Sequence, residues 1–127
     1  MNKGQFLKRV QEYAHINKRE RAEELCKVVF HLLSARLTEN ESRDLKSQLP
    51  SGIKEMWKEV EEKGVIKFHR DEFLERIMNE GRLESIVIAE IVAKTVFKVL
   101  KEQITKGEAD DVAAQLPKDL KEMWFSV

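Results

Sequence analysis

The chain lacks most of the residues and patterns that would point to a particular chemistry. Its 127 residues include one cysteine, two prolines and five glycines, and its 23 basic residues are balanced by 23 acidic ones. The single cysteine, Cys26, excludes an intramolecular disulfide and fits a reducing compartment. A protein that follows nucleic-acid phosphates needs a basic excess, which is missing here. No phosphate-binding glycine loop or Gly-x-Ser-x-Gly pattern is present, so we do not expect an enzyme.

A long hydrophobic run is also missing. The most apolar stretch, residues 86–100, is interrupted every four residues by Glu90, Lys94 and Lys98. This spacing is typical of a buried helix with one solvated face and not of a membrane span. The first residues carry no apolar segment of the kind found in signal peptides. We therefore expect one cytoplasmic domain over residues 1–127, long enough to bury its own core.

What the chain does contain is an internal repeat with a constant offset of 67 residues. Phe6 corresponds to Phe73 and Trp57 to Trp124, and 20 of the 60 pairs at this offset are identical. Unrelated segments would match at roughly one position in fifteen. The sequence therefore predicts a tandem duplication, with repeat one at about 1–60, repeat two at about 68–127 and a short connector at 61–67.

Apolar residues at helical spacing predict about four helices in each repeat. The first is expected at about 3–14, and its counterpart should end near Gly81. The second is the long one, at about 18–37 and 84–104, and it has apolar residues on two faces. A helix of that kind is packed on both sides, so the two long helices should lie at the centre. The predicted fold is all-α, a single pseudo-two-fold helical bundle.

Threonine and proline mark the third and fourth helices. Thr38 and Thr105 are each followed three residues later by glutamate, which predicts a capping box at the start of the third helix. Pro50 and Pro117 end that helix and are expected at the first position of the fourth, where a missing amide costs little.

Both tryptophans belong to a ten-residue stretch that occurs twice, at 48–57 and 115–124. In each copy an aliphatic residue, a methionine and a tryptophan are spaced i, i+3 and i+4, which places them on one helix face. We interpret Trp57 and Trp124 as buried residues that close the core of each half.

The repeated segments resemble a known family. Phe-Leu-Glu-Arg-Ile at 73–77, the stretch 107–120, and the matching segments 6–10 and 44–50 are similar to the bacterial domain-of-unknown-function family numbered 2267. The paired Gln-Leu-Pro motifs make the resemblance specific, and it covers nearly the whole chain. It implies an all-helical two-repeat domain in a small bacterial protein and implies no activity. One departure is Gly52, where the second half has Asp119; glycine should weaken the first turn of that helix.

Several polar residues occur in both halves, and two interpretations of them stay open. Arg9, Arg76, Gln48 and Gln115 could line a polar groove between the repeats. Alternatively, each arginine bridges the first helix to the third and each glutamine satisfies a helix end. The second interpretation is favoured, because a duplicated scaffold needs its joints in both copies. The remaining pairs of this kind are Lys27 with Lys94, Glu41 with Glu108, and Asp44 with Asp111.

The histidines and the cysteine do not predict a metal or catalytic site. His15, His31 and His69 have no histidine counterparts in the other half, and no two of them stand at ligand spacing. Cys26 aligns with Ala93 in an apolar stripe, so we interpret it as a small core residue. No metal ion and no cofactor is expected.

The most informative positions are those at which the halves differ. Arg21 and Glu24 in the first half become Ile88 and Ile91 in the second. The candidate interface consists of Ile86, Val87, Ile88 and Ile91. Four apolar side chains near a helix start need a cover, from the connector through Val65 and Ile66 or from another chain. The connector is favoured, because association costs more entropy than covering by the same chain.

No pattern in the sequence assigns a biochemical function. The favoured hypothesis is a non-enzymatic helical scaffold or protein-interaction module, with a second copy or another protein as partner and no membrane. One alternative is a small-molecule binder or enzyme that uses the groove between repeats. Another is weak nucleic-acid binding through the third and fourth helices, which Glu55 and Glu59 disfavour because they would face phosphates.

Overall fold

The computed structural model describes residues 1–62 and 66–127, and the described chain is all-α. Its helices are α1 (Lys3–Ala14), α2 (Arg19–Arg36), α3 (Glu39–Ser47), α4 (Ile53–Val60), α5 (Arg70–Glu80), α6 (Ile86–Lys101), α7 (Lys106–Ala114) and α8 (Lys118–Phe125). The bounds of α1 agree with the prediction, and α2 and α6 are shorter at both ends than the ranges 18–37 and 84–104. None of the helices in the two described ranges is both long enough and apolar enough to cross a lipid bilayer.

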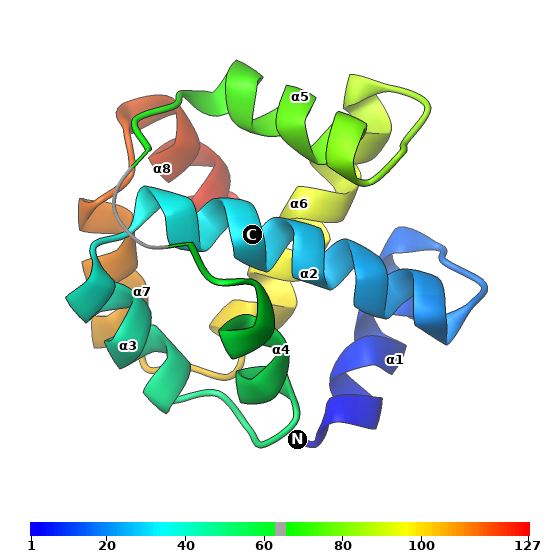
Figure 1. The fold of residues 1–127 in the computed structure, drawn as a ribbon, viewed down its shortest axis with the longest axis horizontal. Helices are drawn as coiled ribbons and strands as arrows, with labels where there is room; N and C mark the ends of the chain where they lie inside the picture. The colour runs from blue at the N-terminus through cyan, green and yellow to red at the C-terminus, as the bar shows by residue number, and fades with distance from the viewer. Residues whose placement is uncertain (63–65) are drawn as a thin grey trace.

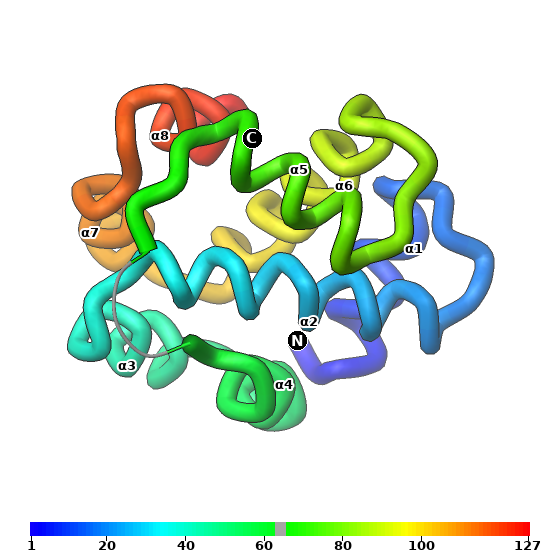
Figure 2. Tube along the Cα trace, turned by 45° about the horizontal axis from the view of Figure 1, so that its top comes forward, coloured from blue at the N-terminus to red at the C-terminus, as the bar shows by residue number. Residues whose placement is uncertain are grey.

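The eight helices form one compact bundle around α2 and α6 (Figure 1). In Figure 1, α6 crosses behind α2, and α5 and α4 lie on opposite sides of α2, as the tube view in Figure 2 also shows. The short helix α1 packs against α6 as well as α2, and α5 packs against α2 as well as α6. The predicted central place of the long helices is confirmed, but the first helix of each half also packs on the long helix of the other half.

Aromatic side chains fill the core in two sets. Phe30 lies between Phe6 and Trp57, with ring centroids 6.3 and 5.2 Å away. In the second half, Phe97 lies in the same way between Phe73 and Trp124, at 5.9 and 5.1 Å. All six rings are fully buried. Burial of this size supplies much of the apolar driving force for folding.

Each buried indole also has a hydrogen-bond acceptor. Trp57 Nε1 donates to Ser42 Oγ at 2.9 Å, and Trp124 Nε1 donates to the Ala109 carbonyl at 3.1 Å. A buried N–H without a partner would cost free energy, so these bonds let tryptophan serve as a core residue. They also tie α4 to α3 and α8 to α7.

The predicted positions of the two prolines are wrong by one residue or more. Pro117 is the N-cap of α8, with ψ 159°, and lies just outside the helix. In the first half, α4 begins only at Ile53 because Gly52 takes φ +91°, a left-handed conformation outside the helical region. A Cβ atom at Gly52 would lie 3.0 Å from Lys3 Cβ, so glycine does more here than weaken a turn.

Among the described residues, two that are not glycine take left-handed backbone angles, and they stand 67 residues apart. His15 has φ 55° after α1, and Arg82 has φ 53° after α5. The prediction that α5 ends near Gly81 is confirmed, because Gly81 is the C-cap residue of this helix; its φ of −82° is not left-handed. A Cβ atom at Gly81 would lie 2.8 Å from the Ile77 carbonyl oxygen and 3.0 Å from Leu25 Cδ2, so a larger residue would require the backbone to shift there.

Candidate functional site

An apolar surface lies on the first turns of α6. Ile86, Val87, Ile88 and Ile91 are 38, 66, 36 and 46% exposed, and we call these four residues the α6 patch. Ser85 starts the helix, because its Oγ accepts a hydrogen bond from the Ile88 amide at 3.2 Å. The patch is therefore held on a capped helix and not on a loop.

The other face of the same turns belongs to the core. Ala89 and Ala93 are fully buried, and Val92 is 3% exposed. Val87 and Ile91 stand four residues apart, so their side chains lie together on the outer face of α6. The α6 patch is thus extra apolar surface outside a core that is already complete.

The described part of the connector does not cover the α6 patch. The Ile66 amide donates to the Ala35 carbonyl near the end of α2, and Ile66 itself is 40% exposed. Val65, the other residue expected to provide cover, lies outside the described residues. Within the described chain, all four patch side chains remain open to solvent.

Charges of both signs border the α6 patch. Glu84 is exposed just before it. After it, Lys94 Nζ lies 3.3 Å from Glu90 Oε1, and Glu90 also pairs with Arg70. Burial raises the pKa of the Glu90 carboxyl, but the bond from Lys94 and the charge of Arg70 outweigh it and leave this pKa below its ordinary value. Glu90 is therefore ionised and already paired at neutral pH.

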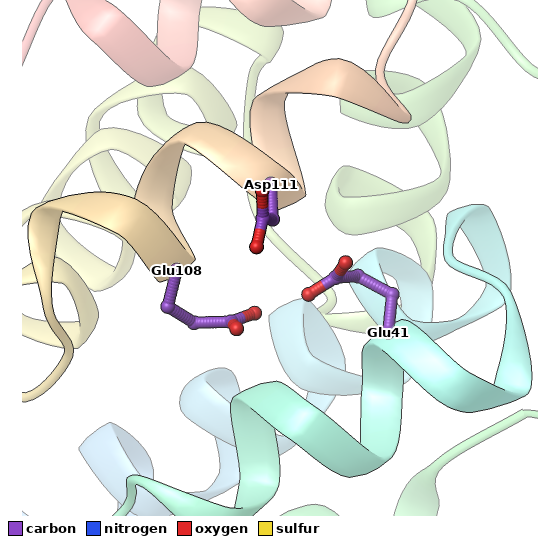
Figure 3. A group of neighbouring side chains, drawn as sticks. All are labelled: Glu41, Glu108 and Asp111. Carbon is purple, nitrogen blue, oxygen red and sulfur yellow. The ribbon is translucent and has the colours of Figure 1, made fainter.

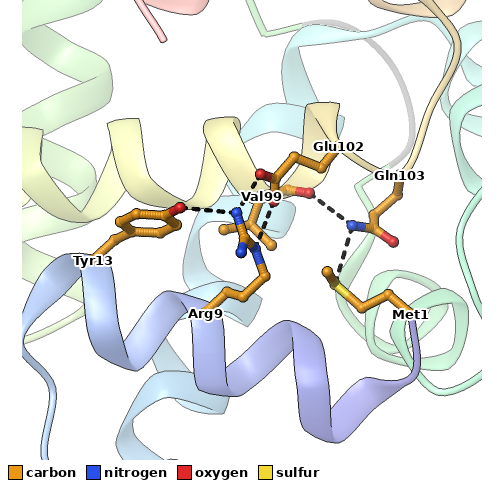
Figure 4. Close-up of polar contacts among 6 residues, drawn as sticks. All are labelled: Met1, Arg9, Tyr13, Val99, Glu102 and Gln103. Atoms are coloured by element: carbon orange, nitrogen blue, oxygen red, sulfur yellow. Dashed lines mark hydrogen bonds and ion pairs between the residues drawn. The ribbon is translucent and has the colours of Figure 1, made fainter.

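Arg9 joins α1 to the end of α6 (Figure 4). Its Nε donates to Glu102 Oε1 at 2.8 Å, and another guanidinium nitrogen donates to the Tyr13 hydroxyl at 2.9 Å. The hydrogen bond to Glu102 raises the pKa of Arg9. The expectation that this arginine bridges the first helix to the third was wrong, because its partner comes from the long helix of the other half.

Arg76 lies elsewhere and has other partners. It donates to Glu72 one turn earlier in α5, at 3.1 Å, and its guanidinium carbon lies 5.4 Å from the centre of the Phe68 ring. Arg9 lines a cavity with Met1, Gln5, Lys8 and Glu12 and without Arg76. The structure thus places the two predicted groove arginines on separate surfaces.

The two predicted groove glutamines do lie at one joint, between α3 and α7. Gln48 Oε1 accepts a hydrogen bond from the Thr105 amide at 2.8 Å, and Gln115 Oε1 accepts one from the Thr38 amide, also at 2.8 Å. Each glutamine is the C-cap residue of its own helix, and its side chain also accepts a hydrogen bond from the N-cap amide of the other helix. Their role is structural and reciprocal.

This arrangement corrects the predicted capping boxes. Thr38 Oγ1 accepts from the Glu41 amide at 3.2 Å, and Thr105 Oγ1 accepts from the Glu108 amide at 3.1 Å, as expected. The two glutamates do not complete the box, because a glutamine from the other half takes the N-cap amide. Glu41 and Glu108 turn toward each other instead. The only sequence signal for this pair was its recurrence at offset 67.

Cys26 and the histidines do not form a site in the described chain. Cys26 is fully buried, and burial raises the pKa of its thiol, so it is not a reactive nucleophile. His31 Nδ1 lies 2.9 Å from the Val60 carbonyl oxygen, and His69 Nδ1 lies 3.6 Å from Asp119 Oδ2. These contacts involve separate elements, and neither contains a second histidine.

Comparison with known proteins places the chain in a family. A family model described as "Uncharacterized conserved protein (DUF2267)" matches residues 3–123. No curated protein matches the chain.

Proposed function

The chain belongs to the DUF2267 family, and from that premise we propose that it is a non-enzymatic protein-interaction module that associates with a second copy of itself through the α6 patch. The single observation that carries this proposal is the exposure of four β-branched apolar side chains on one capped helix. A soluble monomer gains nothing from such side chains at its surface, whereas an interface buries them.

The charges around the patch favour a copy of the same surface as the partner. Glu84 and Lys94 stand five residues to either side of Ala89, one acidic and one basic. When two α6 helices pack antiparallel about a two-fold axis, Glu84 of each copy faces Lys94 of the other. The dipoles of the two helices then point in opposite directions, which is the favourable arrangement for neighbouring helices. The patch is therefore self-complementary in charge as well as in hydrophobicity.

Four side chains make a small interface core. Stable protein interfaces bury about 800 Å² on each partner, so we expect a weak dimer with a Kd on the order of 100 µM. Weak self-association suits a scaffold that assembles when its local concentration rises.

Sedimentation velocity over a range of protein concentrations tests the proposal. The wild-type chain is expected to shift from monomer to dimer, and Ile91→Glu is expected to stay monomeric. Because Ile91 is half exposed, its replacement should change the free energy of unfolding by only about 0.5 kcal/mol. Phe125→Ser removes an exposed apolar side chain outside the patch and serves as the matched control.

Cross-linking gives a second readout. Cys26 is buried, so Ile88→Cys introduces a thiol that is accessible where the native one is not. Oxidation should link this variant into dimers, because position 88 lies near the proposed two-fold axis. Phe125→Cys should not link. A wild-type chain that remains monomeric up to about 1 mM would overturn the proposal, since this exceeds the expected Kd.

The tandem duplication also belongs to this proposal, as the origin of the scaffold. Its support is the offset of 67 residues that relates the bounds of α3 and α7, the left-handed residues His15 and Arg82, and the reciprocal glutamine caps. On this view the α6 patch is a surface acquired by the second copy, where the first copy kept Arg21 and Glu24.

A further inference from the structure

Two glutamates meet carboxyl to carboxyl where α3 lies beside α7. Glu41 and Glu108 each occupy the third residue of their helix, the position that normally bonds back to the N-cap amide. Here Gln48 and Gln115 bond those amides from across the joint. Both carboxylates are thereby released from capping, and Figure 3 shows them directed toward one another.

Both carboxylates are buried without a partner. Glu41 is 9% exposed and Glu108 is 6% exposed. The Oε2 atom of each is shielded from solvent and receives no hydrogen bond from the described residues. In residues 1–62 and 66–127, no ion pair reaches either side chain. An unpaired buried carboxylate costs several kcal/mol, so the pair needs either protons or a cation.

A third carboxylate completes the group. Asp111 stands one turn after Glu108 on α7, and its oxygen lies with those of Glu41 and Glu108 in a set whose members are all within 4.8 Å of one another (Figure 3). Unlike the glutamates, Asp111 is exposed. The group therefore consists of two buried carboxylates and one exposed carboxylate.

The raised pKa of Glu108 indicates that the group of carboxylates lacks a neighbouring positive charge. Burial raises the pKa of Glu108 to about 8, and the adjacent Glu41 carboxyl and the charges of Asp111 and Asp44 act in the same direction. The N-terminus of α7 would by itself lower this pKa. Burial and like charge prevail over the helix dipole, and no cationic side chain of the described residues offsets them.

We propose that Glu41, Glu108 and Asp111 bind a divalent cation of the hard, oxygen-preferring class, such as Ca²⁺, Mg²⁺ or Mn²⁺. Carboxylate oxygens are the ligands that these ions prefer. Metal–oxygen bonds of about 2.0–2.6 Å place ligand oxygens of one ion up to about 5 Å apart, which accommodates the observed spacing. Water would complete the coordination on the side of Asp111. The ion would link α3 to α7 and so join the two halves.

A shared proton is the competing account of the same geometry. One proton between Glu41 and Glu108 would satisfy both shielded oxygens without a metal. The two accounts differ in their response to pH, because ligands must lose their protons before a cation binds. Cation binding should be tight at pH 8 and lost at pH 5, whereas a shared proton is held more firmly at pH 5.

Terbium luminescence provides a direct test, because Tb³⁺ is a hard cation that replaces Ca²⁺ and is sensitised by nearby indoles. Trp57 bonds to Ser42, next to Glu41, and Trp124 bonds to Ala109, next to Glu108, so both indoles lie close to the group. At pH 8 the metal-free chain should sensitise Tb³⁺, and Ca²⁺, Mg²⁺ or Mn²⁺ should displace it. The order of displacement identifies the preferred ion.

Thermal unfolding gives the second readout. At pH 8, the preferred cation should raise Tm by about 5 °C or more over sodium chloride of equal ionic strength. Glu108→Gln should lose at least tenfold in affinity for Tb³⁺ and most of the rise in Tm. Asp110→Asn changes an exposed carboxylate next to Asp111 and should behave as wild type. If Glu108→Gln does not fold, Asp111→Asn removes the exposed ligand instead.

Three results would overturn the proposal. One is a Tm at pH 8 that does not respond to any of the three cations at about ten millimolar, which exceeds the Kd of even weak extracellular sites. Another is an equal loss of Tb³⁺ affinity in Asp110→Asn and Glu108→Gln, which would mean diffuse binding to surface acids. The third is a cation-dependent rise in Tm that Glu108→Gln retains in full, which would assign the glutamate pair to a shared proton.

Discussion

Gln48 Oε1 accepts a hydrogen bond from the Thr105 backbone amide at 2.8 Å, so a side chain from one half of the chain completes the cap of a helix in the other half. Gln115 makes the equivalent bond to Thr38. The joint between α3 and α7 therefore depends on two symmetric side-chain bonds and on the glutamate pair beside them. Its stability can be measured one bond at a time.

Gln48→Ala should lower the free energy of unfolding by about 0.5–2 kcal/mol, as for loss of an N-cap partner. The Thr105 amide should then exchange its hydrogen faster, because it loses its acceptor. Denaturant unfolding and amide hydrogen exchange check both effects. Gln11→Ala removes a glutamine of α1 that bonds to backbone carbonyls within its own half, and it should leave exchange at Thr105 unchanged.

In the absence of divalent cations, stability should fall as pH rises from about 4.5 to about 8. The pKa of Glu108 is raised from 4.5 to about 8 by its burial, the adjacent Glu41 carboxyl and the nearby charges, so in this range the folded chain holds a proton that the unfolded chain has released. The contribution of Glu108 to stability is therefore greatest below the lower pKa and is lost through the higher one.

Glu108→Gln should flatten this pH dependence and raise stability at pH 8 by about 1–3 kcal/mol, because a buried carboxylate becomes a neutral amide. Urea unfolding at several pH values in the presence of a chelator measures the effect. If the stability of Glu108→Gln depends on pH in the same way as that of the wild-type chain, Glu108 is not the cause of the pH dependence. Asp110→Asn is again the control.

Trp124→Ala should destabilise the chain by about 3–5 kcal/mol, as for other buried large aromatic residues. The Trp124 side chain is fully buried and packs against Phe97, and its indole N–H donates a hydrogen bond to the Ala109 carbonyl. Intrinsic fluorescence of the folded wild-type chain should be blue-shifted relative to free tryptophan. A red-shifted emission in the native state would contradict the buried position.

His15→Gly should stabilise the chain by about 1 kcal/mol. His15 is exposed at the end of α1 and holds φ 55°, a conformation that costs a residue with a Cβ atom about 1–2 kcal/mol and costs glycine almost nothing. Thermal and chemical unfolding test this. Lys18→Gly, just before α2 and at φ −100°, should not stabilise, because its backbone is in an ordinary extended region.

Local patterns were enough to predict the helices, and non-local contacts explain what was missed. Phe6, Leu7 and Val10 at helical spacing predict α1, and they are its buried residues. The position of Pro50 relative to α4 was wrong because Gly52 bends the chain beside Lys3, a contact with the distant N-terminal helix. Sequence spacing within one half carries no information about such a neighbour.

The same limit applies to the candidate sites. The partner of Arg9 was misassigned because Glu102 lies 93 residues away, on the long helix of the other half. Glu41 and Glu108 were each interpreted as caps because their own helix offers a cap amide, while the glutamine that takes this amide lies beyond α3 or α7 in the opposite half. The α6 patch could be found from the sequence because its signal is a local difference between the halves.

The packing of α1 on α6 and of α5 on α2 has a consequence for how the chain folds. Neither half contains all the surfaces that bury its own first helix, so a fragment of residues 1–60 or 68–127 would leave an apolar face open. The intact chain should therefore unfold as one cooperative unit, without a stable intermediate in which only one half is folded. Separate fragments should recover helical structure when they are mixed, each acting as the template on which the other folds.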